Sequence, residues 1–214
     1  APRVLLATMW ENNVIPQRKQ YQYTEQEKPG DWWNDMNAWP EWVNARATIL
    51  VVPSQDMREA FLRARTDDGE SIQIDPIVVP LGIDPAYDFK AREEHETFNL
   101  LMYGELSARK PAMETVVEMV MPVLEQHEDW QLIVKTRGAT SVQPQAIKHP
   151  RIKVIYADYT PVQMLNLAHW ADCGLAISRY EGWGLPFREM MAVGLPTIVT
   201  SMSGHLEDID PDYC

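Results

Sequence analysis

The sequence predicts an α/β protein built from Rossmann-like parallel sheets. Strand-like and helix-like patterns alternate from about residue 47 to the end of the chain, which is the order expected when crossover helices join parallel strands. A length of 214 residues fits one or two domains and is long enough to bury a proper core. The composition, 45% hydrophobic and 23% charged, is typical of a globular protein.

The first part of the chain contains three predicted strands and one predicted helix. The strands are expected at residues 3–8, 47–52 and 77–79, and the helix at residues 55–65, with Ser54 as its cap. The first 40 residues are otherwise irregular and carry four tryptophans. Packing against a partner domain is the more usual explanation for such a cluster, and an aromatic platform for a sugar is the alternative.

A polar segment at residues 84–96 predicts a linker, so we expect one domain at residues 1–84 and a second at residues 85–214. In the second domain, the helix after residue 160 opens with a capping box, in which Thr160 is the cap and Pro161 the first helical residue. The elements expected there are strands at 98–103, 131–134, 151–156, 173–177 and 196–200 and helices at 111–126, 161–171 and 187–193.

Charge and composition exclude several classes of function. A net charge of −12 argues against nucleic-acid binding, although local cations and helix ends can still hold a small anionic ligand. The two cysteines and five histidines show no zinc-ligand spacing. No apolar run is long enough to cross a membrane and no secretory pattern opens the chain, so the expected location is the cytoplasm.

Ligands of open parallel sheets bind beyond the carboxyl ends of the strands, so we examined the residues that follow each predicted strand. Arg109 and Lys110 precede a helix start, where the helix dipole disfavours positive charge, and this suggests a bound anion. For Lys135 and Arg137, simple solvation in a loop is the commoner explanation. The candidate ligand-binding residues at this edge are Arg109, Lys110, Lys135, Arg137, Tyr156, Asp158 and Ser178.

The segment 178–189 is the most informative stretch, because it places two carboxylates around a glycine-containing turn that enters a helix. Glu181 precedes Gly182 and Gly184, and we expect Glu189 in the first turn of a helix that begins at Pro186. Free backbone N–H groups at a helix start attract phosphate, and glycines let a ligand approach the backbone closely. Such turns also occur in ordinary α/β proteins, which is the alternative explanation.

These residues resemble a known family. Glu181 and Glu189, with Gly-Trp-Gly-Leu-Pro between them, are similar to the Glu-x7-Glu motif of retaining GT-B glycosyltransferases of family 4 (glycosyl transferases group 1). Residues 190–200 resemble that family's E-A-M-A-x-G-x-P-V-V continuation. The strings V-V-P-S-Q-D-M-R-E and V-V-P-L-G-I-D resemble the end of its amino-terminal domain and the start of its linker.

The resemblance implies roles for individual residues. Glu181 would contact the donor sugar, Lys110 the donor diphosphate and Glu189 the ribose hydroxyls. The arginine of the family's diphosphate motif falls on Glu105 here, and Arg109 could supply the missing positive charge. The other donor-binding residues would be Lys135, Arg137, Tyr156, Asp158, Ser178, Gly182, Trp183, Gly184 and Leu185.

The resemblance therefore implies a retaining, metal-independent hexosyltransferase without a cofactor, whose donor substrate is a nucleoside diphosphate sugar. The acceptor, whether a glycan, a lipid or a protein, is open. The resemblance implies a near-complete carboxyl-terminal donor-binding domain and a partial amino-terminal domain, truncated at both ends. The alternatives are a non-catalytic sugar-nucleotide-binding module, completed by another subunit or by a second copy of the chain, and a GT-B relative such as an epimerase or a phosphorylase.

Overall fold

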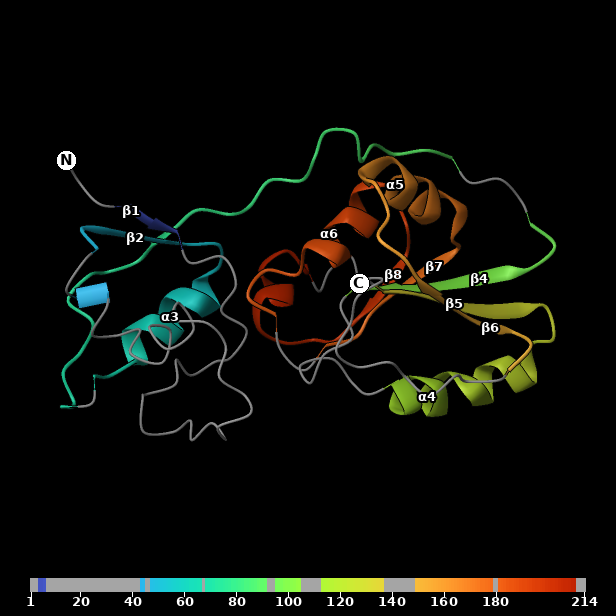
Figure 1. Cartoon of the computed structure of the whole chain (residues 1–214), viewed down its shortest axis with the longest axis horizontal. Helices are drawn as coiled ribbons and strands as arrows, with labels where there is room; N and C mark the ends of the chain where they lie inside the picture. Colours follow the sequence, from blue (N-terminus) through green and yellow to red (C-terminus); the bar gives the residue numbers. More distant parts are fainter. Residues whose placement is uncertain are drawn as a thin grey trace. The chain divides into compact units, whose positions relative to one another are not determined.

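The computed structural model describes residues 4–6, 43–44, 47–66, 68–91, 95–104, 113–136, 149–178 and 181–210. The chain divides into two compact units (Figure 1). The first unit comprises Ala1–Leu81, Tyr180–Trp183 and Met202–Cys214, and the second comprises Gly82–Arg179 and Gly184–Ser201. Two short segments late in the sequence therefore group with the beginning of the chain.

The first unit is built on a parallel sheet of three described strands, in the order β1(Val4–Leu6), β2(Ile49–Val52) and β3(Ile77–Val78). Helix α3(Gln55–Arg63) follows β2 and buries one face against the sheet. The helix ends two residues earlier than the sequence predicts, because Ala64 takes an extended conformation with φ −64° and ψ 148°. The buried residues of this core are Val43, Leu50, Val52, Met57, Phe61, Ala64 and Ile72.

The second unit contains a parallel sheet of five described strands with β4(Phe98–Tyr103) at its centre. β5(Trp130–Thr136) and then β6(Ile152–Tyr156) lie on one side of β4, and β7(Cys173–Ala176) and then β8(Thr197–Val199) lie on the other. Every described pair in this sheet is parallel. The sequence predicted β4 with the bounds that it has, whereas β5 runs further than expected, through Lys135 and Thr136.

Helices cover both faces of the second sheet. Helix α4(Met113–Gln126) packs on one face, and α5(Pro161–Trp170) and α6(Leu185–Ala192) pack on the other (Figure 1). The side chains of β4 alternate accordingly, because neighbouring residues of a strand point to opposite faces. Leu100 and Met102 belong to the core on the α4 side, whereas Leu101 and Tyr103 belong to the core on the α5 and α6 side.

Local signals fix where two of these helices begin. The predicted capping box opens α5: the Thr160 hydroxyl accepts the Gln163 N–H, and the Gln163 side chain accepts the Thr160 N–H at 2.9 Å. Helix α6 begins at Leu185, one residue before Pro186, which the sequence predicts as the first helical position. Its N-cap is Gly184, whose left-handed conformation (φ 79°, ψ 56°) is one that glycine adopts without strain.

The segment at the start of the second unit, which the sequence predicts as a linker, is partly packed against this unit. The Tyr87 side chain contacts the core beneath α5 and α6, and His169 Nε2 lies 3.0 Å from the Asp88 carbonyl oxygen. The Phe89 ring lies against Gly194, where a β-carbon would approach the ring to 2.5 Å. Gly194 also has a φ of 73°, so both space and backbone conformation favour glycine there.

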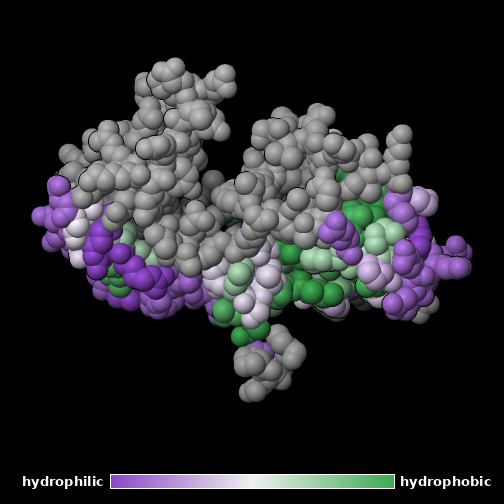
Figure 2. All heavy atoms as spheres, turned by 90° about the horizontal axis from the view of Figure 1, so that it is seen from below, coloured by the Kyte–Doolittle hydropathy of each residue, from purple (hydrophilic) through white to green (hydrophobic). Residues whose placement is uncertain are grey.

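The described surfaces of the two units differ in character. In the view of Figure 2, the described surface of the second unit shows hydrophobic side chains beside hydrophilic ones, and that of the first unit is mostly hydrophilic. Met119 of α4 contributes an exposed hydrophobic side chain to the second unit. No helix in the described ranges is long and apolar enough to span a bilayer.

The packing between β7, β8 and α6 depends on the absence of a side chain at Gly174. A β-carbon there would lie 2.5 Å from Met190 Sδ and 2.8 Å from Thr197 Oγ1. The Met190 side chain can shift, but the threonine hydroxyl is held by its hydrogen bond to the Leu195 carbonyl oxygen at 2.8 Å. Strand β7 can therefore pair closely with β8 only when this position is glycine.

We expect Gly174→Ala to lower the free energy of unfolding by about 1–3 kcal/mol, the usual cost of forcing extra atoms into a packed core. Urea unfolding followed by circular dichroism would measure the change. Gly82→Ala is the matched control, because nothing lies within 4 Å of a β-carbon at Gly82 and we expect almost no effect there. Equal stability of the two variants would contradict the close packing described for β7.

Candidate functional site

Polar groups gather at the carboxyl edge of the second sheet. β7 and β8 are joined there by Thr200, whose Oγ1 accepts the Ser178 N–H at 2.9 Å and donates to the Ala176 carbonyl oxygen at 3.2 Å. On the other side of the centre, the Gly104 N–H donates to the Lys135 carbonyl oxygen and the Ala157 N–H to the Thr136 carbonyl oxygen. The strand ends and the loops that leave them are thus fixed by hydrogen bonds.

Glu189 is held at this edge by Tyr103, the last residue of β4. The Tyr103 hydroxyl lies 3.1 Å from Glu189 Oε2 and 3.2 Å from the Pro186 carbonyl oxygen. The expectation that Glu189 lies in the first turn of its helix is wrong: α6 begins at Leu185, so Glu189 is its fifth residue. The carboxylate is nevertheless brought to the carboxyl edge, because the tyrosine at the end of the central strand reaches it.

The environment of Glu189 raises the pKa of its carboxyl group. Burial raises the pKa of this carboxyl, and the nearby charge of Asp84 raises it further, whereas the hydrogen bond from Tyr103 lowers it. Burial and the Glu189 charge also raise the pKa of the Tyr103 hydroxyl. The same two causes, with a contribution from Asp84, raise the pKa of Tyr87 to about 12. Both tyrosine hydroxyls therefore stay protonated, and that of Tyr103 hydrogen-bonds to the Glu189 carboxyl.

Lys135 places a positive charge at the end of β5. The residue is only 6% exposed, and its Nζ lies 5.0 Å from the centre of the Tyr159 ring. A cation over the face of a tyrosine ring gains electrostatic attraction that offsets part of the cost of burial. The neighbouring Thr136 is also buried, whereas Tyr156 and Asp158, which end and follow β6, are exposed.

The predicted motif residues are divided between the two units. Gly184, Leu185 and Glu189 group with the second unit, whereas Glu181, Gly182 and Trp183 group with the first. Glu181 and Trp183 are both buried. The Glu181 N–H donates to Ser203 Oγ at 3.1 Å, and its carbonyl oxygen accepts the Ser203 hydroxyl at 3.0 Å and the Gly204 N–H at 2.9 Å.

Three predicted site residues, Arg109, Lys110 and Arg137, lie outside the described residues, as does Glu105. Sequence reasoning missed Asp84, Tyr87, Tyr103 and Ser203 as neighbours of the two motif glutamates. For Tyr103, a signal was present: a tyrosine in the last position of a buried strand, directly before Gly104, places a hydroxyl at the ligand-binding edge. For Ser203 there was none, because its contact joins positions that are 22 residues apart.

Two further features of the described residues bear on ligand binding. A cavity of about 130 Å³ lies in the second unit near the carboxyl end of α5, lined by Lys90, Ala91, His95, Asn166, His169 and Trp170. Because α5 starts beyond the end of β6 and runs back to the start of β7, this cavity lies toward the amino edge of the sheet, away from Glu189. Among the described residues, no three His, Cys, Asp or Glu side chains come together as metal ligands.

The sequence profile of one protein family, described as Glycosyl transferases group 1, matches residues 97–212, which is more than half of the chain. No curated protein matches the sequence. The match covers the whole described sheet of the second unit and both motif glutamates.

Solved glycosyltransferase structures resemble the chain over almost all of its length. The pneumococcal O-GlcNAc transferase GtfA, in complex with UDP and GlcNAc, is 16% identical, with 97% of this chain and 39% of that chain covered and a TM-score of 0.65. WaaG, a glycosyltransferase involved in lipopolysaccharide biosynthesis, is 16% identical, with 95% of this chain and 58% of that chain covered and a TM-score of 0.65. The sucrose-phosphate synthase of Thermosynechococcus elongatus is 18% identical, with 96% of this chain and 52% of that chain covered and a TM-score of 0.64.

This likeness confirms the predicted fold class, a Rossmann-like parallel α/β architecture of the GT-B type. The chain spans less than two thirds of the length of each of these three proteins.

The contacts of Glu189 predict how its ionisation responds to substitution. Tyr103→Phe removes the hydrogen bond that lowers the Glu189 pKa, so the pKa should rise, whereas Asp84→Asn removes a nearby negative charge and should lower it. Carbon-13 NMR of protein labelled at the glutamate carboxyl would follow the titration. Tyr156→Phe, at the end of β6, is the control and should leave the Glu189 pKa unchanged; shifts of the opposite sign would contradict the geometry.

The same pKa shift determines how protein stability depends on pH. Because the Glu189 pKa is higher in the folded protein than in the unfolded chain, the folded state keeps a proton that the unfolded state has lost. The contribution to stability is complete below the ordinary carboxyl value of 4.5 and is lost as the pH rises through the raised pKa. Between pH 4.5 and the raised pKa, the free energy of unfolding of Glu189→Gln should fall less steeply with rising pH than that of the wild type.

Proposed function

Because the chain belongs to the Glycosyl transferases group 1 family, we propose that it is a retaining glycosyltransferase of the family 4 type. It would transfer a sugar from a nucleoside diphosphate sugar to an acceptor. The observation that carries this proposal is the placement of Glu189, the second glutamate of the motif, at the carboxyl edge of the sheet by the hydroxyl of Tyr103. Ligands of this fold class bind at that edge.

The first step of the argument concerns the nucleoside. A carboxylate can accept hydrogen bonds from two neighbouring hydroxyls at once, and the ribose of a nucleotide offers such a pair. Tyr103 contacts Oε2 of Glu189, and Oε2 has a further lone pair, as has Oε1. Glu189 is therefore the proposed ribose ligand. Tyr156 and Asp158, exposed beyond β6, are the proposed neighbours of the base.

The second step concerns the diphosphate. Its charge needs cations or backbone donors, and Lys135 provides a buried cation at the same edge, in register with Tyr103 on the neighbouring strand. Gly184 opens α6 without a side chain of its own, so N–H groups of the first turn can face a phosphate. Together with Arg109, Lys110 and Arg137, these groups are the proposed diphosphate ligands, and we propose that transfer needs neither a metal nor a cofactor.

The third step concerns bond making. In the proposed reaction, the bond between the anomeric carbon and the diphosphate oxygen breaks, and its electron pair leaves with the nucleoside diphosphate. The acceptor hydroxyl oxygen bonds to the anomeric carbon from the same face, and its proton passes to the departing diphosphate. This route retains the configuration at the anomeric carbon. Glu181 is proposed to bind the sugar hydroxyls and to stabilise the positive charge that develops on the sugar.

We expect the protein to bind at least one of UDP-glucose, UDP-N-acetylglucosamine, GDP-mannose and ADP-glucose and to release the free nucleoside diphosphate from it. Isothermal titration would measure binding, and a coupled assay for the diphosphate, with a panel of sugar and glycan acceptors, would measure release. Binding without release would favour a non-catalytic sugar-nucleotide module. Absence of binding to every donor would contradict the proposal.

Substitution of the two motif glutamates should affect different steps, turnover for Glu181 and nucleotide binding for Glu189. Glu181→Ala should abolish turnover but bind the free nucleoside diphosphate as the wild type does, because its partner is the sugar. Glu189→Ala should weaken binding of that nucleotide by roughly tenfold or more, the loss expected when charge-assisted hydrogen bonds are removed. If Glu189→Ala left nucleotide affinity intact, the ribose assignment would be wrong.

A further inference from the structure

The backbone of Glu181 is held by residues that follow it by more than twenty positions. Both backbone polar groups of Glu181 bond to Ser203: its N–H donates to the serine oxygen at 3.1 Å, and its carbonyl oxygen accepts the serine hydroxyl at 3.0 Å. The Gly204 N–H donates to the same carbonyl oxygen at 2.9 Å. One hydroxyl thus holds both backbone polar groups of Glu181.

The backbone of Ser203 is in a conformation that serine rarely adopts. Its φ is 46°, and among the described residues it is the one non-glycine residue with a positive φ. Glycine would adopt this conformation without strain, so local backbone preference does not explain a serine here. Strained backbone of this kind is found at sites where the surrounding contacts impose it. The two hydrogen bonds to Glu181 require a side-chain hydroxyl and do explain the serine.

Gly204 lets the two segments approach closely. A β-carbon at this position would lie 2.5 Å from the Gly182 carbonyl oxygen and 2.7 Å from the Glu181 carbonyl oxygen. Backbone atoms cannot move aside as a flexible side chain can, so the contact demands glycine. The turn at Ser203 and Gly204 therefore packs directly against the peptide groups that carry the first motif glutamate.

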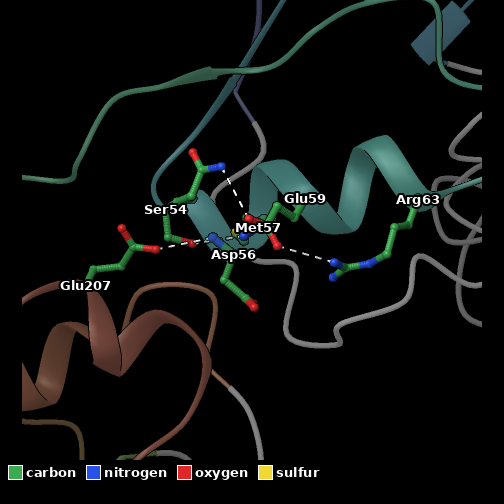
Figure 3. Close-up of polar contacts among 7 residues, drawn as sticks. Ser54, Asp56, Met57, Glu59, Arg63 and Glu207 are labelled. Carbon is green, nitrogen blue, oxygen red and sulfur yellow. Dashed lines mark hydrogen bonds and ion pairs between the residues drawn. The ribbon is translucent and has the colours of Figure 1, made fainter.

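The same turn is anchored to the amino end of α3. Ser203 begins the short 3-10 helix η3(Ser203–Glu207), and Glu207 at its end points toward the first turn of α3 (Figure 3). Glu207 Oε1 accepts the Asp56 N–H at 3.2 Å, beside Ser54, whose hydroxyl accepts the Met57 N–H at 3.1 Å. A carboxylate is favoured at a helix start by the helix dipole and by the N–H groups that lack partners within the helix.

Between these two ends, η3 is fixed by burial. His205 is 2% exposed, and Gly204 is buried as well. The path from α3 to the motif glutamate is thus continuous: Glu207 binds the helix start, η3 is packed in the first unit, and Ser203 binds the Glu181 backbone. Each link is a described contact within the same unit.

From this arrangement we propose that Ser203 is a positioning residue for Glu181, whose hydroxyl holds the glutamate backbone so that the carboxylate meets the donor sugar. The inference rests on the proposed function, since it concerns the rate of sugar transfer. The role belongs to the hydroxyl: alanine and glycine remove it, whereas threonine keeps it. Backbone strain follows a different order, because glycine relieves the positive φ and the β-branched threonine increases it.

Because the presence of the hydroxyl and the backbone strain rank the Ser203 variants differently, the effect on catalysis can be separated from the effect on stability. We would compare the wild type with Ser203→Gly, Ser203→Ala and Ser203→Thr for kcat and KM of nucleoside diphosphate release from the donor, and for the urea midpoint of unfolding. Ser203→Gly and Ser203→Ala should lose about ten- to a hundredfold in kcat, the effect of a small displacement of a catalytic group. KM should stay close to that of the wild type, because Glu189 and Lys135 remain in place.

Ser203→Thr should keep a kcat near that of the wild type although its urea midpoint falls below that of Ser203→Gly. Ser71→Gly, the same change at an exposed serine, is the matched control and should leave kcat unchanged. A wild-type kcat in Ser203→Gly, or equal losses in Ser203→Gly and Ser203→Thr, would overturn the positioning role and leave the proposed function standing. Failure of the wild type to release diphosphate from any donor would overturn the proposed function and the inference with it.

Discussion

The structure depends on the parallel pairing of the second sheet. Because all five described strands run in the same direction, their carboxyl ends meet at one edge, and the residues that follow them share one region. Side-chain alternation then decides which residues face α5 and α6 at that edge. Tyr103 and Lys135 pair in register and point to the same face, so a hydroxyl and a cation come to the same side of the sheet.

The two motif glutamates are held by different kinds of contact. Glu189 is fixed through its side chain, by a tyrosine at the end of the central strand, and burial and Asp84 raise its pKa while Tyr103 lowers it. Glu181 is fixed through its backbone, by a serine and a glycine that close around its peptide groups. A side-chain anchor controls charge and direction, whereas a backbone anchor controls position. These two modes suit the roles proposed for Glu189, as ribose ligand, and for Glu181, as sugar ligand.

Much of the fold could be predicted from the sequence, because the signals were local. The bounds of β4 and the capping box of α5 follow from apolar runs and from the pairing of Thr160 with Gln163. The end of β5 was missed because Lys135 and Thr136 are polar, and no local pattern shows that the Tyr159 ring lies by the lysine. The start of α6 was misplaced by one residue because Gly184, rather than Leu185, takes the cap position.

The motif residues could be located from the sequence, but the residues that hold them in place could not. Tyr103, Asp84 and Ser203 contact or face the motif glutamates across long sequence separations, and such contacts follow from the folded topology alone. The strained φ of Ser203 is likewise invisible in the sequence, since serine occurs in turns of many kinds.

A crystal structure of the protein with its preferred nucleoside diphosphate bound would test the central claim most directly, which is that the carboxyl edge of the second sheet is a nucleotide site. The account predicts the ribose hydroxyls within hydrogen-bonding distance of the Glu189 carboxylate, with Tyr103 still bonded to it, and the diphosphate near the end of β5. A nucleotide bound elsewhere, for example in the cavity beside His169 and Trp170, would contradict it.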